Sequence, residues 1–454
     1  MSPKNNSLLV KNIRHLITCD TNNRVLEHTN MYMEDGWIRY IGPDTPAARK
    51  ELNASGMSVY PGLINTHHHL YQVLTRNLPQ VQNLELFDWL IALYEIWKNL
   101  NADSVYHSSL AGMAELLKTG CTTVFDHHYV FPKGSGDLME AQFAAAETLG
   151  VRMVSSRGSM SLSKKDGGLP PDSVVQTVDE ILRDSKLAVE RFHDPAAGST
   201  QQVVLAPCSP FSVTEDLMRE TATLARTLGV RMHTHLAETK DEEAFVREKT
   251  GMRPLAYMES LGWVGPDVWF AHGIHFNDDE LKRLAETGTG VAHCPSSNMK
   301  LSSGVCRIPE MLDLGVPVGL AVDGSASNDG SSLLGEMRIA YLLHRLTSAE
   351  SAPSGYDILK IATTGSAKVL GRSDIGHLAV GMAADFFAVK EDRLELAGAG
   401  FDVTSMLSTV GLCGGVDATV VHGQILVQDG RICGLCEETI AQNATKEAKK
   451  ILGL

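Results

Sequence analysis

The chain has 454 residues, of which 43% are hydrophobic and 21% are charged, and a formal net charge of −14. This length suffices for a large α/β barrel with an accessory sheet, and so acidic a chain lacks the clustered Lys and Arg that bind nucleic-acid phosphates. Without an apolar run of about 18 residues or an export signal at its start, we expect a cytoplasmic protein that binds neither nucleic acid nor membrane.

Both ends of the chain alternate apolar and polar residues over short stretches. Residues 8–60 include LLVKNIRHLIT and NMYMEDGWIRYIG, and residues 384–390 and 418–432 follow the same pattern. Asp-Gly pairs at 35–36 and 429–430 indicate hairpin turns. We predict that residues 1–60 and 373–454 together form a small β-sandwich, and that the chain ends in a short helix.

The middle of the chain, residues 61–372, alternates short apolar runs with helical segments. Eight candidate strands follow one another: LINTHHH, TTVFDHH, VRMVSSRG, VVLAPCSPF, VRMHTHLAE, VWFAHGI, GVAHCPSSN and VGLAVDGSAS. Eight strands separated by helices predict an α/β fold of the (β/α)8 or TIM-barrel type. Because this fold places its active site at the carboxyl ends of the strands, the polar residues there are candidate functional residues.

Histidines and acids at several strand ends predict a metal site. Side chains alternate along a strand, so His67 and His69 can face the barrel interior while His68 faces the surrounding helices. His235 supplies a third nitrogen and Asp323 a carboxylate. Three nitrogens and one carboxylate with an open position are typical of catalytic zinc, so we predict one Zn²⁺ per chain, with Fe²⁺ as an alternative. Any one of these residues alone could instead be a buried structural histidine or a helix cap.

The segments PGLINTHHH, HTHLAE, FAHG and LAVDGSASN resemble those of the amidohydrolase superfamily, in particular its amino- and chlorohydrolases of purines, pterins and triazines. The resemblance covers nearly the whole chain. It implies metal ligands and a catalytic group: His67, His69, His235 and Asp323 as ligands, and Glu238 and His272 as the catalytic pair, with Asp323 also acting on the attacking water. The fourth strand, QVVLAPCSPF, lacks the lysine that dinuclear relatives carboxylate, so we expect a mononuclear site and a deaminase.

Further segments, among them CTTVFDHHYVFP, SRGSMSLSKKDGGLPP and HCPSSNMKL, are similar to those of bacterial 8-oxoguanine deaminases. This resemblance implies hydrolysis of 8-oxoguanine to urate and ammonia. Asp323 and His272 are then expected to deprotonate water, and Glu238 to carry protons to a ring nitrogen and to the leaving amine. Isoxanthopterin deaminase and triazine hydrolase are the alternative enzymes. The non-enzymatic alternative is a catalytically silent scaffold protein of the same fold.

Five residues are candidate contacts of a flat purine or pterin substrate: Gln72, Trp89, His128, Arg157 and Cys208. Gln72 and Arg157 can donate to a carbonyl oxygen, and Trp89 can cover a ring. Gln72 could instead cap a helix and Arg157 could pair with an acid. Alternation lets only one of His127 and His128 face inward, and the sequence does not say which. We also expect a homo-oligomer.

Overall fold

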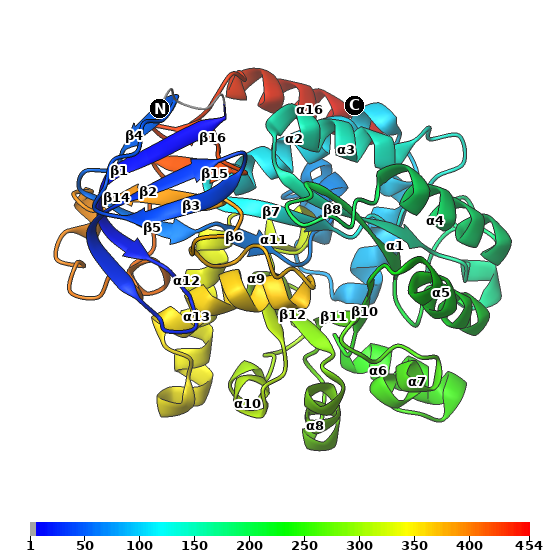
Figure 1. The fold of residues 1–454 in the computed structure, drawn as a ribbon. Coiled ribbons are helices and arrows are strands. Elements are labelled where there is room, and N and C mark those ends of the chain that lie inside the picture. Colours follow the sequence, from blue (N-terminus) through cyan, green and yellow to red (C-terminus); the bar gives the residue numbers. More distant parts are fainter. Residues whose placement is uncertain (1–5) are drawn as a thin grey trace.

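The computed structural model describes residues 6–454, and an eight-stranded parallel sheet forms its centre (Figure 1). Its strands are β6 (Leu63–Asn65), β7 (Cys121–Asp126), β8 (Arg152–Ser159), β9 (Gln201–Pro207), β10 (Met232–Leu236), β11 (Val268–His272), β12 (Gly290–His293) and β13 (Val318–Leu320). Neighbours in the chain are neighbours in the sheet. Thr66 closes the ring, because its backbone N–H and its hydroxyl both donate to the carbonyl oxygen of Leu320, at 3.1 and 3.0 Å. The predicted (β/α)8 barrel is confirmed.

Helices surround this barrel and connect its strands (Figure 1). They are α2 (Ala102–Lys118), α3 (Leu138–Leu149), α4 (Val178–Phe192), α5 (Glu215–Leu228), α6 (Lys240–Thr250), α7 (Pro254–Ser260), α8 (Asp278–Thr287), α10 (Ile308–Leu314), α12 (Leu333–Ser348), α13 (Gly355–Lys360) and α14 (Ser366–Val369), with η3 (Lys164–Asp166), η4 (Ala349–Ser351) and the π-helical η5 (Ile361–Gly365). Local sequence sets their ends. Thr177 and Glu180 form a capping box at the start of α4, and Gly150 ends α3 in the left-handed conformation.

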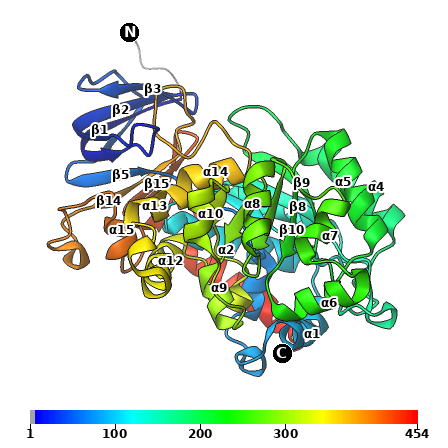
Figure 2. The same ribbon diagram turned by 90° about the horizontal axis from the view of Figure 1, so that it is seen from below.

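A second, nine-stranded sheet uses both ends of the chain and lies beside the barrel (Figure 2). It contains β1 (Ser7–Ile17), β2 (Val25–Glu34), β3 (Trp37–Gly42), β4 (Lys50–Asn53), β5 (Met57–Pro61), β14 (Phe386–Lys390), β15 (Ala418–Val421), β16 (Gln424–Gln428) and β17 (Arg431–Ile432). β5 joins the two halves by pairing with β1 and with β14. The sheet also curves back on itself, because the N–H of Ile38 donates to Met382 and the N–H of Gly381 donates to Ile38, each at 2.9 Å. The expectation of a separate sheet built from both ends is confirmed, whereas the boundaries at residues 60 and 372 stay a prediction.

The remaining helices lie at the carboxyl end of the barrel or pack against its outer helices. They are α1 (Leu86–Trp97), α9 (Pro295–Lys300), α11 (Ser325–Asn328), α15 (Met406–Thr409) and α16 (Glu437–Ile451), with η1 (Leu70–Thr75), η2 (Pro79–Val81) and η6 (Leu394–Leu396). The C-terminal α16 packs on α2, where Glu437 pairs with Lys118. The side-chain amide of Asn99, just after α1, donates to the carbonyl oxygen of Ile451 at 3.1 Å. This hydrogen bond joins the end of α1 to the end of α16.

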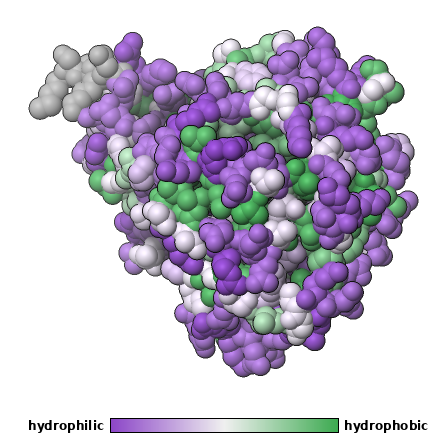
Figure 3. All heavy atoms as spheres, turned by 90° about the vertical axis from the view of Figure 1, so that its right-hand side faces the viewer, coloured by the Kyte–Doolittle hydropathy of each residue, from purple (hydrophilic) through white to green (hydrophobic). Residues whose placement is uncertain are grey.

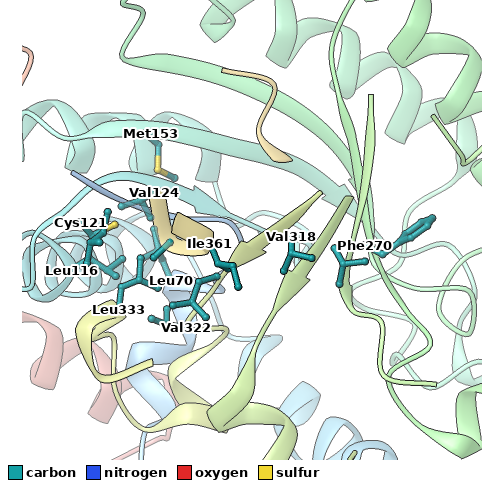
Figure 4. Close-up of a cluster of buried hydrophobic side chains, with 14 of the residues drawn as sticks. Leu70, Leu116, Cys121, Val124, Met153, Phe270, Val318, Val322, Leu333 and Ile361 are labelled. Atoms are coloured by element: carbon teal, nitrogen blue, oxygen red, sulfur yellow. The ribbon is translucent and has the colours of Figure 1, made fainter. Parts of the chain in front are cut away.

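Two hydrophobic layers flank each barrel strand. Phe125 of β7 and Trp269 of β11 meet across the interior with ring centroids 4.9 Å apart. Val124 and Met153, on the opposite faces of their strands, join the large cluster under the outer helices (Figure 4). Since apolar side chains fill both faces, each strand is a nearly continuous apolar run.

The surface shown in Figure 3 is mainly hydrophilic, with smaller hydrophobic areas between the polar side chains. Within residues 6–454, no helix combines the length and the hydropathy that crossing a membrane requires.

Candidate active site

Histidine and acid side chains meet at the carboxyl end of the barrel. Their ligand atoms form two overlapping buried groups, each within 4.8 Å: His67, His69, His127 and His235 in the first, and His67, His272 and Asp323 in the second. These residues come from the ends of β6, β7, β10 and β11 and from the loop after β13. The barrel therefore brings together residues up to 256 positions apart in the chain (67 to 323).

Hydrogen bonds to backbone carbonyl oxygens orient two of these imidazoles, His69 and His235, in the same way. The Nδ1–H of His69 donates to the carbonyl oxygen of His127 at 2.7 Å, and the Nδ1–H of His235 donates to that of Cys208 at 2.6 Å. A carbonyl oxygen can only accept, so each ring carries its proton on Nδ1 and presents an unprotonated Nε2. Both Nε2 atoms thus expose lone pairs towards the centre of the site.

His67 reaches the same state through another histidine. His233 donates from Nδ1 to the carbonyl oxygen of Trp269 at 2.9 Å, so its Nε2 is an acceptor. This Nε2 lies 2.9 Å from Nδ1 of His67, which must therefore carry the proton. The Nε2 of His67 is buried and has no hydrogen-bond partner within the described part of the chain.

The distances between the unprotonated atoms fit a metal ion. The Nε2 atoms of His69 and His235 lie 3.1 Å apart, and Oδ1 of Asp323 lies 3.3 Å from Nε2 of His67 and 3.4 Å from Nε2 of His69. Two facing lone pairs at such a distance repel each other unless a cation lies between them. Zinc bonds of about 2.0–2.1 Å place tetrahedral ligand atoms about 3.3 Å apart. The donor set and its spacing therefore fit a tetrahedral divalent metal.

Burial keeps these imidazoles neutral. It holds the pKa of His69 and of His235 well below the ordinary value, and it also lowers the pKa of His67. Burial would raise the pKa of Asp323, but the closeness of its carboxylate to the rings of His67, His272 and His69 outweighs burial, so this pKa lies well below the ordinary value. The site thus offers neutral nitrogens and a carboxylate, which are the forms that bind a metal.

Glu238 and His272 stand side by side next to Asp323. Nε2 of His272 lies 3.5 Å from Oε2 of Glu238 and 3.9 Å from Oδ2 of Asp323, while its Nδ1 lies 2.8 Å from Oδ1 of Asn298. Burial raises the pKa of Glu238 to about 7. Burial would lower the pKa of His272, but the carboxylates of Glu238 and Asp323 raise it above the ordinary value. Two groups that can exchange a proton near neutral pH therefore flank the metal position.

A pocket opens beside these groups under helix α1. Apolar side chains form much of its wall: Leu86, Trp89, Leu90, Phe211 and Leu301. Gln72, Tyr129, Cys208 and Ser327 add polar atoms. The structure thus places three of the five candidate substrate contacts, Gln72, Trp89 and Cys208, in this pocket.

Arg157 and His128 lie elsewhere, which corrects their predicted positions. Arg157 shares its face of β8 with Met153 and points outward, where its guanidinium covers the ring of Phe131 at 3.8 Å and its Nη2 lies 2.7 Å from Oε1 of Gln176. Burial lowers the pKa of Arg157 to about 10, although Asp184 lies 3.6 Å away. The guanidinium therefore belongs to a separate outer cleft.

His128 turns away from the pocket, because its Nε2 lies 2.9 Å from the carbonyl oxygen of Val130. Its neighbour His127 faces the interior instead, where its ring stacks on His235 at 4.7 Å. His68 also lies outside the metal group, with Nε2 3.0 Å from Oγ of Ser331.

Sequence reasoning did not single out His233 or Tyr129 for a role in the site. His233 precedes His235 by two residues, so alternation along β10 signals that both face inward. Tyr129 stands in the same relation to His127, and its ring centroid lies 5.1 Å from that of His69. Asn298 is the last residue of the candidate strand GVAHCPSSN, and the structure places it on the short helix α9 that follows β12.

Comparison with known proteins places this geometry in a family. The pattern of the Amidohydrolase family matches residues 58–426. An 8-oxoguanine deaminase of Pseudomonas aeruginosa is 45% identical over 93% of this chain and 95% of its own length. A hydroxydechloroatrazine ethylaminohydrolase of Pseudomonas sp. (strain ADP) is 41% identical over 98% of this chain and 95% of its own length. The crystal structure of an atrazine chlorohydrolase from Arthrobacter aurescens complexed with zinc has a TM-score of 0.93 and 32% identity, covering 97% of this chain and 100% of that one.

Proposed function

The chain belongs to the amidohydrolase family, and from this premise we propose that it is a metal-dependent deaminase that hydrolyses 8-oxoguanine to urate and ammonia. The observation that carries the proposal is the group Glu238, His272 and Asp323 beside three unprotonated imidazole nitrogens. The similarity to an 8-oxoguanine deaminase along nearly the whole chain supports the choice of substrate.

We propose His67, His69, His235 and Asp323 as the ligands of one Zn²⁺ per chain. The spacing of their atoms fits tetrahedral coordination, and the pocket lining contains no lysine that could bridge a second ion. When bound, the ion would lower the pKa of water and so supply hydroxide at neutral pH. Fe²⁺ is the alternative ion, and elemental analysis distinguishes the two.

The protein's own groups move the protons of the reaction. His272 and Asp323 lie close enough together to hold the attacking water and to take its proton. Asn298 accepts from Nδ1–H of His272, which leaves Nε2 as the atom that faces the reaction. Glu238, with a pKa of about 7, can protonate the ring nitrogen next to the attacked carbon and then the departing amine.

Pocket residues match the chemistry of an oxidised purine. The indole N–H of Trp89 is buried and has no partner within residues 6–454, so it is a donor available to a purine carbonyl oxygen. Gln72 already accepts from the N–H of Ala326 at 3.4 Å, and its amide N–H groups are further donors. Burial raises the pKa of Cys208 to about 12, so its thiol is neutral. We propose these three residues as substrate contacts.

The pocket is tight in this structure. Its free volume is about 30 Å³, whereas sites for small molecules commonly measure about 300–1,000 Å³. Binding of a bicyclic substrate therefore requires the lining side chains to move apart, and Leu86, Trp89 and Leu90 of α1 form one wall of the pocket.

A substrate panel tests the proposal. Ammonia release should be fastest with 8-oxoguanine, compared with guanine, isoxanthopterin and hydroxylated triazines. If the protein deaminates isoxanthopterin but not 8-oxoguanine, isoxanthopterin would replace 8-oxoguanine as the proposed substrate. A protein that binds no zinc and releases no ammonia from any substrate of the panel would favour a scaffold role. We further propose a cytoplasmic homo-oligomer, which fractionation and light scattering would test.

A further inference from the structure

The start of helix α6 contains an unusual cap around Glu242. Thr239 is the N-cap residue, and its hydroxyl accepts from the N–H of Glu242 at 3.2 Å. In a capping box, the acid at this position would accept from the N–H of the N-cap residue itself. Glu242 instead reaches one and two residues further back, since Oε1 accepts from the N–H of Ala237 and Oε2 from the N–H of Glu238, each at 2.8 Å.

These two N–H groups belong to the turn that aims Glu238 into the pocket. His233 and His235 face the interior of β10, so an unbroken strand would turn Ala237 inward and Glu238 outward. Ala237 reverses this order with a φ of 53°, in the left-handed region that a residue with a Cβ adopts at a cost of about 1–2 kcal/mol. As a result, Glu238 lies 3.5 Å from His272.

We propose that Glu242 is a positioning residue for Glu238, because its carboxylate holds both N–H groups of the left-handed turn. The side chain of Glu242 is fully buried, so solvent offers neither N–H group another acceptor. A glutamine in its place has one acceptor oxygen and would leave one of the two N–H groups unpaired. This inference rests on the proposed function, in which Glu238 transfers the protons.

The test compares Glu242→Gln and Glu242→Asp with Asp241→Asn. Both changes at Glu242 should lower kcat about 10- to 100-fold, since a catalytic group displaced by about 1 Å can cost that much, while KM and metal content should stay near those of the wild type. Asp241 is the matched control, because it is exposed, precedes Glu242 directly and loses the same charge. Its variant should keep wild-type kcat.

Hydrogen–deuterium exchange supplies a readout that does not depend on activity. The peptide that covers residues 236–243 should exchange faster in both Glu242 variants than in Asp241→Asn. Unchanged kcat and unchanged exchange in a folded Glu242→Asp protein would overturn the inference. Loss of kcat that follows loss of metal would also overturn it. Wild-type protein that releases no ammonia from any substrate would instead refute the proposed function, and the exchange experiment would still decide whether Glu242 holds the turn.

Discussion

Replacing His233 by Phe tests whether a histidine that is not a ligand sets the metal affinity of the site. The ring of His233 lies against Trp269 at 4.6 Å and Phe125 at 4.8 Å, so a phenyl ring can occupy the same aromatic cage. The substitution keeps packing close to that of the wild type but removes the Nε2 acceptor 2.9 Å from His67.

The magnitude follows from the two states left to His67. Its ring can keep the proton on Nδ1, where a buried donor without a partner costs about 1–3 kcal/mol. Alternatively the proton moves to Nε2, and the lone pair that faces Asp323 and the metal is lost. In the metal-free variant the proton can move to Nε2, next to Asp323, and metal binding must return it to the unpaired Nδ1 position. His233→Phe should therefore raise the metal Kd about 10- to 100-fold, as changes next to metal ligands commonly do.

Competition with a zinc-binding dye measures this Kd directly on metal-free protein. His293→Phe is the control, because His293 is equally buried but pairs with His344 and not with a ligand. We expect the His293 variant to bind zinc as the wild type does. At saturating zinc, ammonia release by the His233 variant should largely recover. A folded His233→Phe protein with a Kd within about twofold of the wild type would refute the reasoning.

Three further changes test other parts of the structure. Glu238→Gln should reduce ammonia release by about 10²–10⁴-fold without changing metal content, and full activity would contradict its role as a proton donor. Arg157→Met should leave kcat/KM within about twofold and lower the free energy of unfolding by about 1 kcal/mol, because the guanidinium pairs with Gln176 and with Asp184 of α4, outside the pocket. Partial burial opposes ionisation of Asp374, but Arg372 lowers its pKa from 3.8 to about 2. Asp374→Asn should therefore cost about 1 kcal/mol in urea unfolding at pH 7, and this loss should shrink as the pH falls below about 4; an equal loss at pH 3 would contradict the assignment.

The sequence predicted the barrel well because its signals are local. Short apolar runs mark the eight strands, and side-chain caps such as Thr177 and glycine stops such as Gly150 mark several of the helices between them. The inward position of His67 and His69 also follows from alternation. The closure of the ring at Thr66 and the curvature of the second sheet depend on contacts between residues far apart in the chain, and no local pattern encodes them.

The direction of individual side chains was harder to predict. Alternation says which residues share a face, but it does not say which face is inside, because both faces of a barrel strand are apolar. For β8 the answer comes from Val154, which packs in the interior layer, so that Arg157, an odd number of residues away, must point outward. Alternation from Phe125, which also packs in the interior layer, likewise places His127 inward and His128 outward. The errors at Arg157 and His128 thus share one cause.

Three residues in or next to the site have a backbone conformation that the strand pattern does not predict. Ala237, His272 and Asp323 have φ angles of 53°, 71° and 61°, although none is glycine. Each left-handed residue costs about 1–2 kcal/mol, and each follows or ends a barrel strand. At Ala237 and His272 the reversal turns inward a side chain that alternation would send outward, since Ala271 precedes His272 on the inner face. Hydrogen bonds from outside the strands hold these turns, among them Glu242 to the N–H groups of residues 237 and 238, and the N–H of Asp323 to the carbonyl oxygen of His67 at 3.1 Å. The geometry of the proton-transferring group is therefore set by the acceptors around the strand ends, which is why a change at such an acceptor should affect kcat without removing any group that touches the substrate.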